Sequence, residues 1–164
     1  MLSKEPHHKL FIPGPVEVLP EVLDQLSRPA IGHRTKNYMK VHAELIPKLQ
    51  KLLYTGNRIW LSTSSATGVW EAAVRNCVTR KALACVCGAF SKKWGQVVKL
   101  NGKEVDVYDV PMGKPNLPGE IDKRLSTGEY DAILVVHNET STGVMNPLKD
   151  IAEVMKKYPD VTFM

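Results

Sequence analysis

Short runs of consecutive apolar residues alternate along the chain with longer segments in which apolar residues recur every three or four positions. The runs predict strands buried on both faces, and the segments predict helices that cover a sheet. The expected strands are 58–62, 82–87, 104–110, 132–136 and 161–164. Strands joined by helices in this order are typical of parallel βαβ units, so we expect an α/β fold with a mostly parallel, doubly wound sheet.

The expected helices follow a spacing of three or four residues. One stripe has apolar residues spaced by four, four and three positions: Val41, Leu45, Leu49 and Leu52. It predicts a helix that begins near Asn37, ends at Gly56-Asn57 and is kinked by Pro47. The other expected helices cover 20–27, 68–78, 91–100, 118–126 and 147–158, the last with Pro147 in its first turn. Because the chain stops inside its last expected strand, we expect it to be a piece of a longer protein.

Composition and charge exclude several classes of protein. The 164 residues are 43% hydrophobic and 24% charged, as in an ordinary globular domain. No apolar run reaches the roughly 18 residues of a membrane-spanning helix, and the first residues lack the apolar core of a signal peptide. The net charge of +5 is spread along the chain without a basic tail. We therefore expect no membrane and no nucleic-acid partner.

The three cysteines, Cys77, Cys85 and Cys87, show no disulfide spacing, which indicates a reducing compartment and a cytoplasmic location. Cys85 and Cys87 share a face of one expected strand, but no Cys/His pair follows at the spacing of zinc ligands. Buried apolar thiols are the favoured interpretation, and we expect no metal site.

Loops after the strands carry residues suited to binding, because ligands of parallel α/β sheets bind outside the carboxyl ends of the strands. The Ser/Thr-rich segment 61–68 lies between an expected strand and a helix, where backbone amides and hydroxyls suit a phosphate. A plain Ser/Thr helix cap explains it equally well. The segment 88–95 offers Trp94 either as a stacking aromatic or as a core residue, and its pattern alone favours the core.

Two further segments are polar. The run 137–143 follows the clearest expected strand, which favours a binding loop over a plain turn. The second is residues 32–35, which follow the earlier turn Pro13-Gly14-Pro15. Arg34 in this segment either binds a carboxylate or lies in a solvated turn. Taken one at a time, these segments leave the function open.

Taken together and in this order, the segments resemble the class V aminotransferases, which are pyridoxal-phosphate enzymes of the aspartate-aminotransferase fold. The matching stretches are Pro13-Gly14-Pro15, Ile31-Gly32-His33-Arg34, Ser64-Ser65-Ala66-Thr67-Gly68, Gly88-Ala89-Phe90-Ser91 with Trp94, and Asn138-Glu139-Thr140-Ser141-Thr142-Gly143-Val144. The resemblance is nearest to the alanine–glyoxylate and serine–pyruvate aminotransferases. It implies a truncated fold type I large domain, with a substrate-side arm over 1–35 and the N-terminal half of the cofactor-binding domain over 36–164.

The resemblance also implies roles in holding pyridoxal 5'-phosphate. The family's phosphate loop falls on Ser65, Ala66 and Thr67. Its ring-stacking aromatic falls on Trp94, and the side chain that bonds the pyridine 3-oxygen falls on Thr140. Ala66, like Ser64 before it, departs from the Gly-Ser-Gly pattern that the family often has there.

Residues on the substrate side are implied as well. Gly14, His33 and Arg34 match segments that lie near the substrate, and the pair His33-Arg34 is expected to reach a partner subunit's site in a homodimer. The implied reaction moves an amino group from alanine or serine to a 2-oxo acid such as glyoxylate or pyruvate.

The family's catalytic groups are expected beyond Met164. These are the Schiff-base lysine, the aspartate at the pyridinium nitrogen and the arginine for the substrate carboxylate. We therefore expect no catalytic residue in this chain and no activity from the chain alone; an organellar address would also lie outside it. The alternatives are a cysteine desulfurase or another lyase of the same fold, and a non-catalytic phosphate- or nucleotide-binding α/β domain, against which Trp94 and Thr140 argue.

Overall fold

The structure is a computed structural model that describes residues 8–164. The chain divides into two compact units, one ending at Leu61 and the other covering Ser62–Met164. The part of the expected arm before residue 8 lies outside the described residues. The division expected after residue 35 stays a prediction.

The first unit contains two helices, α1 (Pro20–Leu26) and α2 (Lys36–Leu52), close to their predicted positions. Helix α2 continues through Pro47, and the hydroxyl of Thr35 caps it by accepting a hydrogen bond from the backbone N–H of Tyr38 at 3.3 Å. The strand predicted over 58–62 is wrong: these residues form no strand, and Trp60 is 79% exposed. A strand needs a neighbouring backbone for its hydrogen bonds, and the described residues of this unit offer no other strand.

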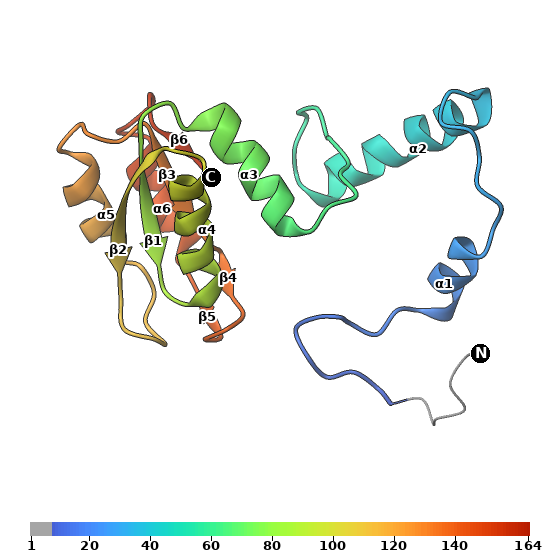
Figure 1. Cartoon of the computed structure of the whole chain (residues 1–164), viewed down its shortest axis with the longest axis horizontal. Helices are drawn as coiled ribbons and strands as arrows, with labels where there is room; N and C mark the ends of the chain where they lie inside the picture. Colours follow the sequence, from blue (N-terminus) through green and yellow to red (C-terminus); the bar gives the residue numbers. More distant parts are fainter. Residues whose placement is uncertain (1–7) are drawn as a thin grey trace. The chain divides into compact units, whose positions relative to one another are not determined.

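The second unit is built on a parallel sheet of four strands (Figure 1). They are β1 (Lys81–Val86), β2 (Glu104–Asp109), β3 (Ala132–Val135) and β6 (Thr162–Phe163), in the order β2-β1-β3-β6. These are the other four predicted strands. Every neighbouring pair is parallel. The predicted α/β class is therefore confirmed.

Helices cover both faces of this sheet because successive residues of β1 point to opposite sides. Ala82, Ala84 and Val86 pack into one apolar core with side chains of α3 (Ala66–Cys77) and α4 (Ala89–Leu100). Leu83 and Cys85 pack into the other core, which contains side chains of α5 (Pro118–Leu125) and α6 (Leu148–Met155). Figure 1 shows α4 to the right of β1 and α5 to the left of β2. The sheet is thus wound on both sides, as predicted.

Two details differ from the sequence expectation. A short antiparallel hairpin, β4 (Asn138–Glu139) with β5 (Val144–Met145), follows β3, and each of its strands is too short to show a period. Its turn needs Gly143, whose φ is +72°. Pro147 lies at the position just before α6 and not within its first turn.

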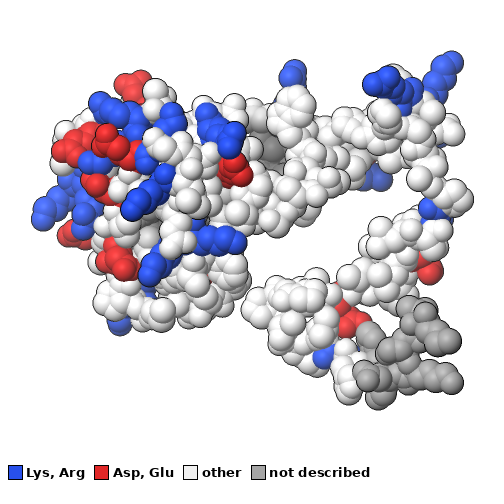
Figure 2. Space-filling model, viewed as in Figure 1, with Lys and Arg blue, Asp and Glu red and all other residues white. Residues whose placement is uncertain are grey.

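The second unit has buried cysteines and a surface of mixed charge, as the sequence predicts. Cys85 and Cys87 are buried free thiols, as expected, and burial raises the pKa of Cys85 to about 12. Figure 2 shows positive and negative side chains intermixed over Ser62–Met164 on the face in view. No helix among residues 8–164 is long and apolar enough to cross a membrane.

Candidate functional site

The carboxyl ends of β1, β2 and β3 lie side by side. Cys85 pairs with Val135 of β3, and Val86 pairs with Asp109 of β2. The loops that follow β1 and β3 therefore meet at one edge of the sheet. Several hydrogen bonds join them; for example, the backbone N–H of Ala89 donates to the Ser141 hydroxyl at 2.9 Å, and the Thr142 hydroxyl donates to the Cys87 carbonyl at 3.1 Å.

Glu139 lies at the centre of this junction and is fully buried. One carboxylate oxygen accepts from the backbone N–H and the hydroxyl of Ser91, at 2.9 and 2.8 Å. The other accepts from the Ser141 hydroxyl at 2.6 Å and from the Phe90 N–H at 3.3 Å. Burial alone would raise the pKa of Glu139, but the bonds from Ser141 and Ser91 outweigh it, so the pKa lies below its ordinary value.

The carboxylate of Glu139 occupies the N-terminus of α4, where backbone N–H groups have no partner within the helix. Gly88, the residue before α4, leaves the space for it: a Cβ there would lie 2.5 Å from Glu139 Cγ and from Ser141 Oγ. The first turn of α4 is thus supplied with a negative charge by the chain itself.

Helix α3 begins differently. Ser65 is its N-cap residue in an extended conformation, and its side chain makes no capping hydrogen bond. The first turn of α3 contains no acidic residue. Ser65 and Ala66 are exposed and Thr67 is half-buried. The predicted phosphate loop therefore forms an accessible helix N-terminus whose amides can receive an external anion.

Trp94 lies one turn along α4 from Ser91 and belongs to the apolar core on that face. It is 8% exposed and stacks on Trp70 of α3, with ring centroids 5.5 Å apart and planes inclined by 18°. Its indole N–H is buried without a hydrogen-bond partner. The structure thus gives Trp94 a packing role, and the predicted contact with a ring stays a prediction.

Thr140 stands between Glu139 and Ser141 and is exposed. The hydroxyls of Ser141 and Thr142 bond to the chain, whereas no hydrogen bond found among residues 8–164 uses the hydroxyl of Thr140. Its side chain is therefore available to a ligand at the edge of the sheet.

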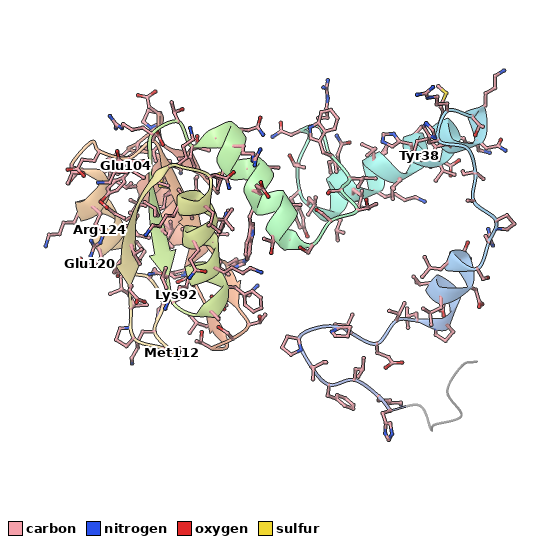
Figure 3. The ribbon with its side chains drawn as sticks, in the orientation of Figure 1. Tyr38, Lys92, Glu104, Met112, Glu120 and Arg124 are labelled. Carbon is pink, nitrogen blue, oxygen red and sulfur yellow. The ribbon has the colours of Figure 1, made fainter. Side chains whose placement is uncertain are left out.

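A hollow of about 470 Å³ lies where β1 and β2 end, beside the start of α4. Its lining includes Gly88, Lys92, Asp109 and Met112. Figure 3 labels Lys92 on α4 and Met112 on the loop after β2. None of the predicted site residues lines this hollow.

Comparisons with known proteins agree with this fold. The chain is 42% identical over 154 residues to an uncharacterized aminotransferase of Methanocaldococcus jannaschii, covering 91% of the chain and 40% of that protein. It is 33% identical over 141 residues to the serine–glyoxylate aminotransferase of Methylorubrum extorquens, covering 82% and 35%. The crystal structure of the ureidoglycine–glyoxylate aminotransferase of Bacillus subtilis matches with a TM-score of 0.89 at 27% identity, covering 99% and 43%.

The resemblance to the class V aminotransferases is confirmed. The fold type I assignment is confirmed with it. No family model matches the chain. The chain spans less than half the length of each relative named above.

The predicted substrate-side residues of the class V family lie in the other compact unit. Gly14, His33 and Arg34 are all exposed. The structure therefore brings Ser65–Thr67, Trp94 and Thr140 into one unit and leaves the substrate-side residues in another.

The class V motifs did not reveal two buried features of this edge. Glu139 lies in a polar run that resembles an exposed loop, and only its place directly after a strand signals burial. Asn116 and Asn146 are also buried, and they link the strand ends: Asn116 donates to the Tyr108 carbonyl at 3.2 Å and Asn146 to the Val136 carbonyl at 2.8 Å. Neither asparagine belongs to a segment that the sequence singles out.

Proposed function

We propose that this chain forms part of a pyridoxal-5'-phosphate-dependent aminotransferase. The reaction moves an amino group from a small amino acid, alanine or serine, to a 2-oxo acid, glyoxylate or pyruvate. Relatives named as glyoxylate aminotransferases support this choice. The observation that carries it is the contrast between two helices: Glu139 occupies the N-terminus of α4, whereas the N-terminus of α3 is left open for an external anion.

The start of α3 fits a phosphate group. The amides of Ala66 and Thr67 lie in the first turn, where helix N–H groups have no partner within the helix. The hydroxyls of Ser65 and Thr67 add two donors. Because no carboxylate lies in this turn, the partial positive charge of the helix is not neutralised.

The ring of the cofactor would contact the next two residues. Bound pyridoxal phosphate supplies an electron sink for amino-group chemistry. The Thr140 hydroxyl would hold the 3-oxygen of the ring as a hydrogen-bond donor, and the exposed part of Trp94 would supply the aromatic contact. Trp70 stacks on Trp94, so the indole is held in one orientation.

Substrates, assembly and location follow from the same family. Gly14, His33 and Arg34 bind on the substrate side, with His33 and Arg34 reaching the site of a partner subunit in a homodimer. The guanidinium of Arg34 suits the carboxylate of an amino acid or a 2-oxo acid. The free, buried thiols of Cys85 and Cys87 support a cytoplasmic location.

The phosphate loop can be tested with Thr67→Ala, with Thr127→Ala as the matched control. Thr127 is an exposed threonine after α5 whose hydroxyl donates to the Arg124 carbonyl at 2.8 Å. NMR titrations with inorganic phosphate and with pyridoxal phosphate measure both dissociation constants. We expect Thr67→Ala to weaken both ligands by about tenfold, the value of one hydrogen bond to a charged group.

The control variant should bind both ligands as the unchanged chain does. Equal affinities of Thr67→Ala and the unchanged chain would contradict the proposed loop. A chain that binds phosphate but shows no preference for pyridoxal phosphate would favour the non-catalytic phosphate-binding alternative.

A further inference from the structure

Glu139 is a buried carboxylate that no cation neutralises. Its side chain is fully buried, and none of the ion pairs found among residues 8–164 includes it. Its charge is balanced by backbone N–H groups and hydroxyls from two separate parts of the chain. Burying a charge in this way is costly unless every acceptor is satisfied, so its geometry is tightly determined.

The donors to Glu139 belong to the elements that carry the proposed ring contacts. Ser91 and Phe90 form the first turn of α4, and Trp94 follows on the same helix. Ser141 belongs to the turn of the β4–β5 hairpin and bonds to both Glu139 and Ala89. Thr140 stands between two residues that are each anchored to α4, so its backbone cannot move independently of that helix.

We propose that Glu139 is a positioning residue that holds Trp94 and Thr140 in a fixed mutual arrangement. The inference rests on the proposed function for its ligand, since these two residues are the proposed ring contacts. Glu139 itself is fully buried, and its side chain is not exposed at the edge of the sheet. The hydrogen bonds of its carboxylate found among residues 8–164 go to the first turn of α4 and to Ser141, and none of them reaches the phosphate loop before α3.

The hydrogen-bond donors around Glu139 require a negatively charged carboxylate, and not only a side chain of the same shape. Each carboxylate oxygen accepts from a backbone N–H: one from Ser91 at 2.9 Å, the other from Phe90 at 3.3 Å. A backbone N–H can only donate. Glutamine has the same shape, but its NH₂ group would face one of these N–H groups in either orientation. Glu139→Gln therefore sets a donor against a donor at the start of α4.

The experiment compares Glu139→Gln with Glu153→Gln in the 164-residue chain. Glu153 is an exposed glutamate of α6 that pairs with Lys156 at 2.6 Å, so it controls for the loss of a charge. Two readouts are taken by ¹⁵N NMR. The first is the position of the Trp94 indole and Thr140 amide signals. The second is the pair of dissociation constants for pyridoxal phosphate and inorganic phosphate.

We expect Glu139→Gln to shift both NMR signals. It should raise the dissociation constant for pyridoxal phosphate by about tenfold and leave that for inorganic phosphate within about twofold of its original value. Glu153→Gln should change none of these. Unmoved signals with unchanged affinities would overturn the proposal. An equal loss for both ligands would overturn it too, because a general loss of structure affects the phosphate loop as much as the ring contacts.

A second variant covers the case in which Glu139→Gln does not fold. Ser141→Ala keeps the carboxylate and the backbone N–H that donates to it, and removes only the bonds that the Ser141 hydroxyl makes with Glu139 and Ala89. The same split between the two ligands is therefore expected at a smaller size. A larger loss of affinity for inorganic phosphate than for pyridoxal phosphate would overturn the proposal. If the unchanged chain binds neither ligand, the proposed function fails, and the Trp94 and Thr140 signals still decide the role of Glu139.

Discussion

At the scale of single residues, the edge of the sheet shows two ways to satisfy a helix N-terminus. Helix α4 receives a carboxylate from within the chain, whereas α3 presents free donors. Both arrangements follow from the same property, the partial positive charge and unpaired amides of a helix start. The side chain that fills one of them decides which remains for a ligand.

The low pKa of Glu139 predicts how its stabilising effect depends on pH. The folded state holds the carboxylate charged, so its contribution is present above the ordinary pKa of 4.5 and is lost as pH falls through the lower folded value. The melting temperature of the unchanged chain should exceed that of Glu139→Gln by a constant amount above about pH 5.5. The difference should shrink steadily as the pH falls below 4.5.

Thermal unfolding followed by circular dichroism between pH 3 and pH 7 measures this difference. Glu153→Gln, whose carboxylate is exposed, should show a small and nearly constant difference over the same range. If the difference in melting temperature between the unchanged chain and Glu139→Gln does not narrow as the pH falls, Glu139 is not stabilised as a carboxylate.

At the scale of elements, the junction between β1 and α4 depends on a close approach of two backbones. Gly88 has an extended φ of 171°, so its conformation suits any residue and only its lack of a side chain matters. Glu139 and Ser141 occupy the space that a Cβ would need. The loop after β3 can therefore reach α4 only over a glycine.

Gly88→Ala should destabilise the fold by about 1–3 kcal/mol, because a methyl group must displace buried, hydrogen-bonded atoms. Gly119→Ala is the matched control: Gly119 lies in α5 with no atom within 4 Å of its Cβ position, and alanine there should stabilise by roughly 0.5 kcal/mol. Urea unfolding of both variants checks the two signs. A neutral Gly88→Ala would mean that the β4–β5 hairpin yields easily.

The sequence predicts elements where a single local pattern determines them. The strands β1 and β3 are continuous apolar runs, and both lie where the runs predict. The run 58–62 contains the apolar residues Ile59, Trp60 and Leu61, but a strand also needs a partner, which sequence patterns do not report. The loops of the candidate site were predicted from polar residues after strands. Glu139 was not, because its burial depends on donors about 50 positions earlier in the chain.

At the scale of the whole molecule, the chain carries part of what its relatives contain. It covers 40% of the Methanocaldococcus relative and 43% of the Bacillus structure. The unit formed by Ser62–Met164 contains the predicted phosphate loop and the proposed ring contacts. No lysine of this chain matches the Schiff-base position of the class V resemblance, so the proposed chemistry needs groups from elsewhere.

The 164-residue chain alone should therefore not transaminate. Without a lysine at the aldehyde and a carboxylate at the ring nitrogen, bound pyridoxal phosphate has no covalent anchor and no protonated ring. Incubation with pyridoxal phosphate, alanine or serine, and glyoxylate, followed by glycine analysis, measures this. Glycine formation at the rate of a full-length relative would show that residues of this chain perform the catalytic roles assigned beyond Met164.

The stack of Trp70 on Trp94 gives the chain an optical reporter of its own. Two indoles with centroids 5.5 Å apart are close enough to couple their electronic transitions, and such coupling contributes a circular-dichroism band whose strength depends on the mutual orientation of the rings. Trp70 belongs to α3 and Trp94 to α4, so the band exists only while these helices are docked on each other. Circular dichroism can thus report, without a label, whether α3 stays docked on α4.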